Sequence, residues 1–406
     1  MKSIRELYRT GKGPSSSHTM GPSRGAVIFG SKHPEISLFR AVLFGSLAAT
    51  GRGHLTDIAV KEAFAPHPVE IIWKPDEELP LHSNGMRFEG LDDNGEVLCF
   101  EEDYSVGGGA LMSDARELPD IYPYDTVDEV LAESEKIGET FWEYVVRHEG
   151  EDILCFLEDI WKVMHMAVEK GLKAKGPLPG SLGLIRKAGS FKRSSGSRGA
   201  DFRCDALLAA YAYAVSEENA CGGEVVTAPT CGSCGVLPAV LYYFAENNGF
   251  SANDIVRALA VAGLFGNIVK TNGSICGSLV GCQGEIGTAC AMAAAAATQL
   301  LGGTLRQIEY AAEMGLEHHL GLTCDPVAGL VQIPCIERNA HAAARALNCS
   351  HFSLLSDGSH RISFDDVTAV LLETGKALTT PYKETSTGGL AKVFASHIKP
   401  PTSSLR

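Results

Sequence analysis

Long runs of lysine and arginine are missing from this chain of 406 residues. Acidic residues outnumber basic ones by 49 to 35, and the formal net charge is −14 at pH 7. Proteins that bind nucleic acid or an anionic membrane surface through charge carry clustered basic residues. We therefore expect neither nucleic acid nor a membrane among the partners of this protein.

Two hydrophobic signals are also missing. The first residues, 1–8, lack the apolar core of a signal peptide. The most apolar stretch, residues 286–301, is rich in alanine and shorter than the ~20 residues that a membrane span needs. It predicts a buried helix instead. We expect a cytoplasmic protein whose 12 cysteines are thiols or metal ligands rather than a disulfide framework.

The hydrophobic pattern changes character along the chain. A helical stretch near residues 24–30 and short β-rich runs bounded by turn residues predict a small α+β domain; the runs are residues 41–44, 69–73, 87–91 and 97–101. Apolar residues then recur every three or four positions, which predicts helices over residues 127–137, 153–169, 205–215, 254–269, 285–301, 305–316, 336–346 and 364–378.

The expected fold is thus a small N-terminal α+β domain followed by a large all-α domain. We place the small domain at residues 1–115, a linker at 116–130, the helical domain at 131–395 and a C-terminal tail at 396–406.

Three cysteines stand in polar loops punctuated by glycine and proline: Cys282, Cys324 and Cys335. Each comes just before, or at the start of, a predicted helix, where unsatisfied N–H groups and the helix dipole favour a thiolate. The same setting suits an anionic iron–sulfur cluster, whose sulfurs accept hydrogen bonds from such donors. The alternative is that they are small buried apolar side chains, as free cysteine often is.

A Cys-x-x-Cys pair, Cys231 and Cys234, occupies a glycine-rich loop. Such a pair can be a redox pair or half of a zinc site. A zinc site needs a second pair of ligands at short spacing, and the sequence has none. A further interpretation, beside a redox pair, is that the loop only shapes the wall of a pocket.

The segment Gly13–Pro22 is the most unusual of the chain, because it places hydroxyl groups and an imidazole between two Gly-Pro pairs. Hydroxyl and N–H groups can hold a carboxylate, and an imidazole can move a proton. The candidate substrate-binding residues are Ser15, Ser16, Ser17 and Thr19, and the candidate catalytic residue is His18. The alternative is a cap for the next helix, and both roles can coexist.

A second loop, residues 50–57, presents another imidazole. His54 stands three residues before Asp57, so a histidine base with a carboxylate partner is possible here. The alternative is a histidine whose hydrogen bonds serve structure alone.

Taken in order, these segments resemble the signature segments of the iron–sulfur L-serine dehydratases (L-serine ammonia-lyases). The resemblance runs from about residue 4 to residue 391. It rests on residues 13–22, 51–57, 227–239, 281–287, 317–332, 334–340 and 382–390.

The resemblance implies an enzyme of amino-acid degradation and gluconeogenesis that converts L-serine into pyruvate and ammonia. It implies a [4Fe–4S] cluster held by Cys282, Cys324 and Cys335, with no pyridoxal phosphate, and active-site roles for the Ser15–Thr19 loop and for His54. A homodimer is the default expectation for a soluble enzyme.

The chain departs from the family pattern in three places. Some family members end in a cysteine that occupies the fourth iron, but no cysteine follows Cys349 here. The fourth iron is then open to water or capped by another group. Cys276 lies in a segment where relatives often carry Ser-Gly-Ala-Glu, and Cys231 stands where some relatives have asparagine.

These residues support a mechanistic hypothesis. An iron that lacks a protein thiolate acts as a Lewis acid on the serine hydroxyl, while His54 or His18 takes the α-proton and Asp57 orients the base. One alternative is a cluster-dependent lyase that prefers L-cysteine or L-threonine. Another is an amino-acid or metal sensor without turnover.

Overall fold

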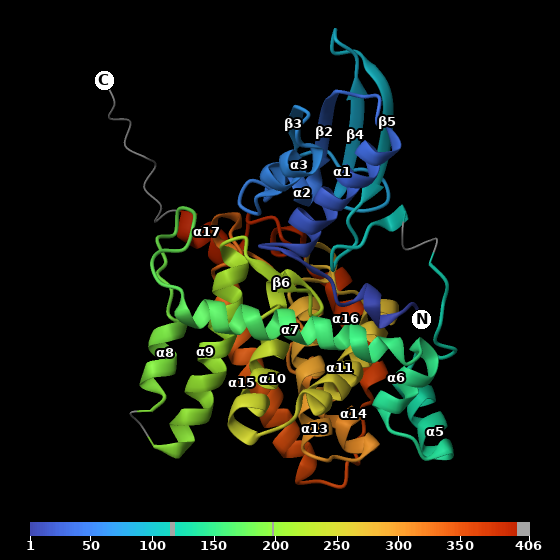
Figure 1. The fold of residues 1–406 in the computed structure, drawn as a ribbon, viewed down its shortest axis with the longest axis vertical. Coiled ribbons are helices and arrows are strands. Elements are labelled where there is room, and N and C mark those ends of the chain that lie inside the picture. Colours follow the sequence, from blue (N-terminus) through green and yellow to red (C-terminus); the bar gives the residue numbers. More distant parts are fainter. Residues whose placement is uncertain (114–117, 197–198, 396–406) are drawn as a thin grey trace.

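The computed structural model describes residues 1–113, 118–196 and 199–395. It has a small α/β domain above a large helical domain (Figure 1). The predicted fold class is therefore confirmed. The predicted tail, 396–406, and residues 116 and 117 of the predicted linker lie outside the described residues, and the predicted domain limits stay predictions.

The small domain is built on a four-stranded sheet in the order β3-β2-β4-β5. The strands are β2 (Leu38–Phe44), β3 (Val69–Lys74), β4 (Gly85–Leu91) and β5 (Val97–Tyr104). Strand β2 is parallel to β3 and antiparallel to β4, which is antiparallel to β5. Helices α1 (Gly21–Lys32) and α3 (Thr56–Phe64) contribute to a core with the sheet, and α2 (Gly45–Ala49) follows β2 directly. All four predicted strands are confirmed.

Four phenylalanines link the sheet of the small domain to its helices. Phe39 of β2 stacks on Phe64 of α3 with ring centroids 4.3 Å apart. Phe29 of α1 and Phe88 of β4 lie 6.1 Å apart in the same core. These apolar contacts fix α1 and α3 against the sheet. They thereby also fix the positions of the loops that precede both helices.

The helical domain contains each of the predicted helices. Its helices are α5 (Val127–Ile137), α6 (Phe141–Glu149), α7 (Asp152–Lys173), α8 (Ala188–Ser194), α9 (Ala200–Ala220), α10 (Val236–Asn248), α11 (Ala252–Asn272), α12 (Gly277–Val280), α13 (Thr288–Leu300), α14 (Leu305–Glu317), α15 (Cys335–Leu354), α16 (Phe364–Ala377) and α17 (Gly389–Ala395). Short helical turns are η1 (Ile4–Glu6), η2 (Ser16–Met20), η3 (Cys231–Ser233), η4 (Gln283–Gly287), η5 (Val327–Gly329) and η6 (Thr380–Tyr382).

Helix α13 lies at the centre of the helical domain and packs against α11, α14 and α15. Its residues Thr288 to Thr298 are all buried, and most of them are alanine. Small side chains let neighbouring helices approach closely: a Cβ added at Gly315 of α14 would lie 2.9 Å from the Cα of Ala291. The alanine-rich stretch is a buried helix, as predicted.

Helix α11 has the length and the apolar composition of a membrane span. Its most apolar window is 78% buried inside the protein, which is typical of a central helix in a bundle.

The N-terminal segment packs with the helical domain. Met1, Ile4, Leu7 and Tyr8 belong to the hydrophobic core of that domain. Strand β1 (Thr10–Lys12) then pairs antiparallel with β6 (Glu224–Val226). The chain therefore crosses from the helical domain into the small domain at the Gly13–Pro22 segment.

Replacing Leu7 with alanine tests this packing. Leu7 is fully buried and lies against Gly266 of α11, so we expect Leu7→Ala to lower the free energy of unfolding by about 2–5 kcal/mol. Denaturant titration measures the change. The matched control is Leu98→Ala, because Leu98 of β5 is 61% exposed and its loss is expected to stay within about 0.5 kcal/mol. Equal effects of both changes would contradict this packing.

Candidate active site

A small cavity lies where loops of the two domains meet. It is lined by Pro14, Ser15, His54, Gly232, Cys282, Glu285, Ile286, Cys324, Pro326, Val331, Cys335 and Glu384. Its volume in this structure is about 20 Å³, which is close to the space of a single water. A larger ligand therefore requires the surrounding side chains to move apart.

The three predicted cluster ligands come together at this cavity. Cys282, Cys324 and Cys335 are all buried and line its wall. The loops of Cys282 and Cys324 are joined directly, because Gln283 N donates a hydrogen bond to Leu322 O at 3.2 Å. A Cβ at Gly281, whose φ is +76°, would lie 2.7 Å from the same carbonyl oxygen, so this close approach requires glycine.

Arg338 links the third cysteine to the other two. It lies one turn after Cys335 on α15, and its Nη1 donates a hydrogen bond to Thr323 O at 2.7 Å. The guanidinium interacts electrostatically with all three thiols. A partly buried cation in this position compensates negative charge on sulfur.

The local settings of the three cysteines differ from the prediction in one case. Cys282 directly precedes η4, and Cys335 is the first residue of α15. Cys324 does not begin a helix; it pairs in a parallel bridge with Lys383. The neighbouring Cys282 thiol and burial raise the pKa of Cys324, and burial raises that of Cys335.

Glu285 stands beside the thiols. Its Oε2 lies 3.8 Å from Cys282 Sγ and 4.0 Å from Cys324 Sγ. Its Oε1 accepts a hydrogen bond from Thr230 Oγ1 at 2.7 Å. Burial, together with the nearby Glu384, raises the pKa of Glu285 to about 8.

His54 enters the cavity from the small domain. It is fully buried, and neither ring nitrogen has a hydrogen-bond partner among the described residues. A Cβ at Gly53 would overlap the backbone of Gly329, so the His54 loop lies tightly on the helical domain. Burial lowers the pKa of His54 well below its ordinary value, which keeps the imidazole neutral and able to accept a proton.

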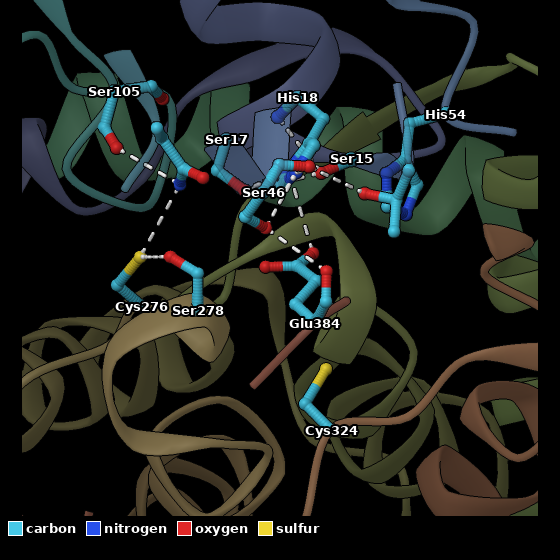
Figure 2. A network of polar contacts seen from close by, with 12 residues as sticks. Ser15, Ser17, His18, Ser46, His54, Ser105, Cys276, Ser278, Cys324 and Glu384 are labelled. Atoms are coloured by element: carbon cyan, nitrogen blue, oxygen red, sulfur yellow. Dashed lines mark hydrogen bonds and ion pairs between the residues drawn. The ribbon is translucent and has the colours of Figure 1, made fainter. Parts of the chain in front are cut away.

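His18 is held by hydrogen bonds at both ring nitrogens. Ser17 Oγ lies 2.9 Å from Nδ1, and Ser46 O lies 3.1 Å from Nε2. Glu384 Oε1 lies 3.6 Å from Nδ1, and the rings of His18 and His54 are 4.5 Å apart. Burial lowers the pKa of His18 to about 4. Figure 2 shows this group of polar side chains next to Cys324.

The loop Ser15–Thr19 both stabilises the local structure and contributes to the cavity wall. Ser15 lines the cavity, and its Oγ also accepts a hydrogen bond from His18 N at 3.1 Å, capping η2. Thr19 Oγ1 donates to His54 O at 2.7 Å and thereby ties the two histidine loops together. Ser16 and Ser17 are buried beside them. The loop rests on α9, because Asn219 Nδ2 donates to Pro14 O at 2.8 Å.

Two family models match almost the whole chain. Residues 3–65 and 62–116 match the serine dehydratase beta chain, and residues 120–391 match the serine dehydratase alpha chain. The chain belongs to the serine dehydratase family. In this chain the two parts form one polypeptide, and their junction falls between the two domains of the structure.

Curated members of the serine dehydratase family align with nearly all of this chain. An L-serine dehydratase of Streptomyces coelicolor is 40% identical over 96% of this chain and 98% of the relative. An L-serine dehydratase of Haemophilus influenzae is 38% identical over 96% of this chain and 99% of the relative. L-serine dehydratase 1 of Escherichia coli is 37% identical with the same coverage.

One predicted site residue of this chain lies away from the cavity. Asp57 is in the first turn of α3 and forms an ion pair with Lys61 at 3.7 Å. It does not hydrogen-bond to His54, whose ring nitrogens have no partner among the described residues. Asp57 thus pairs along its own helix, and its role as an orienting partner of the base stays a prediction.

The additional cysteines lie beside the three-thiol group without joining it. Cys276 contacts Ser278 Oγ at 3.2 Å and Asn84 Nδ2 at 3.8 Å (Figure 2). Cys231 and Cys234 are buried in and after η3, and Cys231 Sγ lies 3.8 Å from Met20 Sδ. Within the described part of the chain, the groups whose ligand atoms lie close enough to hold a metal ion are Cys282, Glu285 and Cys324, and His18, His54 and Glu384. None of the three additional cysteines belongs to either group, and Cys335 borders the cavity outside them.

The sequence analysis missed two carboxyl groups of the site, Glu285 and Glu384. Both stand in segments on which the family resemblance rests, and both line the cavity. Glu285 stands three residues after the candidate ligand Cys282, and this spacing could have identified it as a residue of the site. Glu384 had no local signal, because it is 60 positions from Cys324 and reaches it through tertiary pairing alone.

Proposed function

We propose that this protein is an L-serine dehydratase, which converts L-serine into pyruvate and ammonia with the help of a [4Fe–4S] cluster. One observation carries the proposal: three cysteine thiols and the unpartnered imidazole of His54 border the same buried cavity. Near full-length similarity to relatives named L-serine dehydratase supports the choice of substrate. A homodimer and a cytoplasmic location stay predictions from the sequence.

The donor set fits a cluster held by Cys282, Cys324 and Cys335. All three donors are cysteine sulfurs, which iron–sulfur clusters prefer, and the cationic Arg338 offsets part of the charge that three thiolates add. When bound, the cluster would supply a Lewis acid for the departing hydroxyl group. Among the described residues no fourth cysteine lines the cavity, which supports a cluster with one corner available to a ligand.

The residues of the chain supply the rest of the reaction. The Ser15–Thr19 loop binds the substrate carboxylate through hydroxyl and N–H groups, with Ser15 nearest the cavity. His54 takes the α-proton, since its nitrogens are unpartnered, whereas both nitrogens of His18 are engaged. Loss of the α-proton and the β-hydroxyl as water leaves 2-aminoacrylate. Its imine tautomer takes up one water and releases pyruvate and ammonia.

An anaerobic assay on the iron-reconstituted protein tests this function. We expect about four irons and four sulfides per chain, as a [4Fe–4S] cluster contains, together with pyruvate from L-serine. Pyruvate from L-cysteine, or 2-oxobutyrate from L-threonine, at a higher kcat/KM than serine turnover would assign a different substrate. Tight binding of serine without any product would indicate a sensor.

A further inference from the structure

The backbone at Glu384 is fixed in an unusual conformation. Its φ is +58°, in the left-handed region that residues other than glycine seldom adopt. Three hydrogen bonds hold it there: Glu384 N donates to Cys324 O at 2.8 Å, Cys324 N donates to Tyr382 O at 2.9 Å, and Ser46 Oγ donates to Glu384 O at 3.0 Å. A strained residue held by its surroundings on both domains points to a functional side chain.

The carboxyl group of Glu384 has one oxygen free. The residue is 6% exposed, and its Oε1 faces His18 Nδ1 at 3.6 Å. Its Oε2 is buried and has no hydrogen-bond partner among the described residues. Buried polar atoms are nearly always hydrogen-bonded, because an unpartnered one loses its interaction with water without compensation. An external donor is the expected partner of this oxygen.

Glu384 is the acceptor at this cavity that remains available to a cation. The other carboxyl group in the wall, Glu285, already has Thr230 at one oxygen and the thiols of Cys282 and Cys324 near the other. The remaining polar side chains of the wall are Ser15, His54 and the three cysteines. None of them is a carboxyl group, and the thiols are those that the proposed cluster would occupy. Burial raises the pKa of Glu384 itself to about 8, and an ammonium group beside its carboxyl group would favour the ionised form.

L-Serine carries three polar groups that must be matched when it is buried. In the function proposed above, the hydroxyl group meets the metal site and the carboxylate meets the Ser15–Thr19 loop, while His54 faces the α-hydrogen. The α-ammonium group is left without a partner. We propose that Glu384 Oε2 binds this ammonium group, so that Glu384 selects α-amino acids over acids that lack the amino group. This inference rests on the proposed function.

The test compares two ligands that differ only at the amino group, L-alanine and propanoate. Neither carries a β-hydroxyl group, so binding is measured by anaerobic calorimetry on the cluster-loaded protein without turnover. We expect the wild type to prefer L-alanine. We expect Glu384→Gln to weaken L-alanine binding by roughly 10- to 100-fold, as for loss of a charged hydrogen bond. The affinity for propanoate should stay within about threefold of the wild-type value. The KM for serine should rise in parallel.

Matched variants separate the possible outcomes. Glu373→Gln makes the same chemical change at an exposed position of α16 and is expected to leave both affinities unchanged. Equal weakening of L-alanine and propanoate by Glu384→Gln, or a wild type without preference for L-alanine, would overturn the role of Glu384. If Glu384→Gln does not fold, Glu384→Asp carries the test: selective weakening of L-alanine supports the role, and equal weakening of both ligands overturns it.

Failure of the proposed function has a different signature. A wild type that binds L-alanine in preference to propanoate but forms no product from L-serine, L-cysteine or L-threonine would contradict the dehydratase reaction and leave ammonium binding at Glu384 supported. A wild type that makes pyruvate from serine, with selectivity unchanged in Glu384→Gln, would contradict the role of Glu384 alone.

Discussion

Replacing any one of Cys282, Cys324 and Cys335 with serine is expected to abolish cluster binding and, with it, the conversion of serine to pyruvate. The three thiols border one cavity and come from separate loops, so loss of one leaves an iron without its thiolate. Loss of a hydrogen-bond partner of a ligand alone typically lowers activity 10- to 100-fold. We therefore expect a loss of more than about 100-fold here, together with loss of bound iron and sulfide.

The control for this experiment is Cys276→Ser. Cys276 is also buried, lies in the segment before Cys282 and contacts Ser278 and Asn84, but it does not line the cavity. It is expected to retain iron, sulfide and the visible absorbance of the cluster. A variant at Cys324 that keeps a full complement of iron would remove Cys324 from the ligand set, and the same holds for the other two positions.

Replacing His54 with glutamine is expected to have the second large effect: turnover should fall while the cluster stays bound. The imidazole is buried, and its nitrogens are unpartnered at the cavity. Loss of a general base typically lowers kcat by about 10²- to 10⁴-fold. The cluster should remain, because His54 is not among its proposed ligands. Steady-state kinetics and iron analysis of the same preparation measure both properties.

The pH profile and a matched variant complete the His54 experiment. Burial lowers the pKa of His54 well below 6.5, so lowering the pH from 8 toward 6.5 should not protonate it or reduce kcat/KM through this group. His341→Gln, at an exposed position of α15, is expected to leave kcat unchanged. Normal turnover by His54→Gln would place the base elsewhere.

Local sequence patterns were sufficient for the four strands of the small sheet and for eight helices of the helical domain, but they did not indicate α3, α6 or α10. Short β-rich runs bounded by turn residues became β2 to β5, and the three-to-four-residue period became long helices, including the alanine-rich α13. These features depend on residues that are near one another in the chain. The N-terminal segment behaved differently. Nothing local to Ile4, Leu7 and Tyr8 indicates that they belong to the core of the helical domain, because that depends on the surface they meet.

The candidate site shows the same division between what local sequence determines and what only the tertiary structure decides. The sequence by itself determined the chemical inventory: three cysteines in glycine- and proline-punctuated loops, a hydroxyl-rich loop and two histidines. Only the tertiary structure decided which of these groups share a cavity. It turned Asp57 toward Lys61 despite its nearness to His54 in sequence, and it brought Glu384 to Cys324 across 60 positions. Side-chain direction and backbone pairing between distant segments set these contacts, and neither is encoded in local spacing.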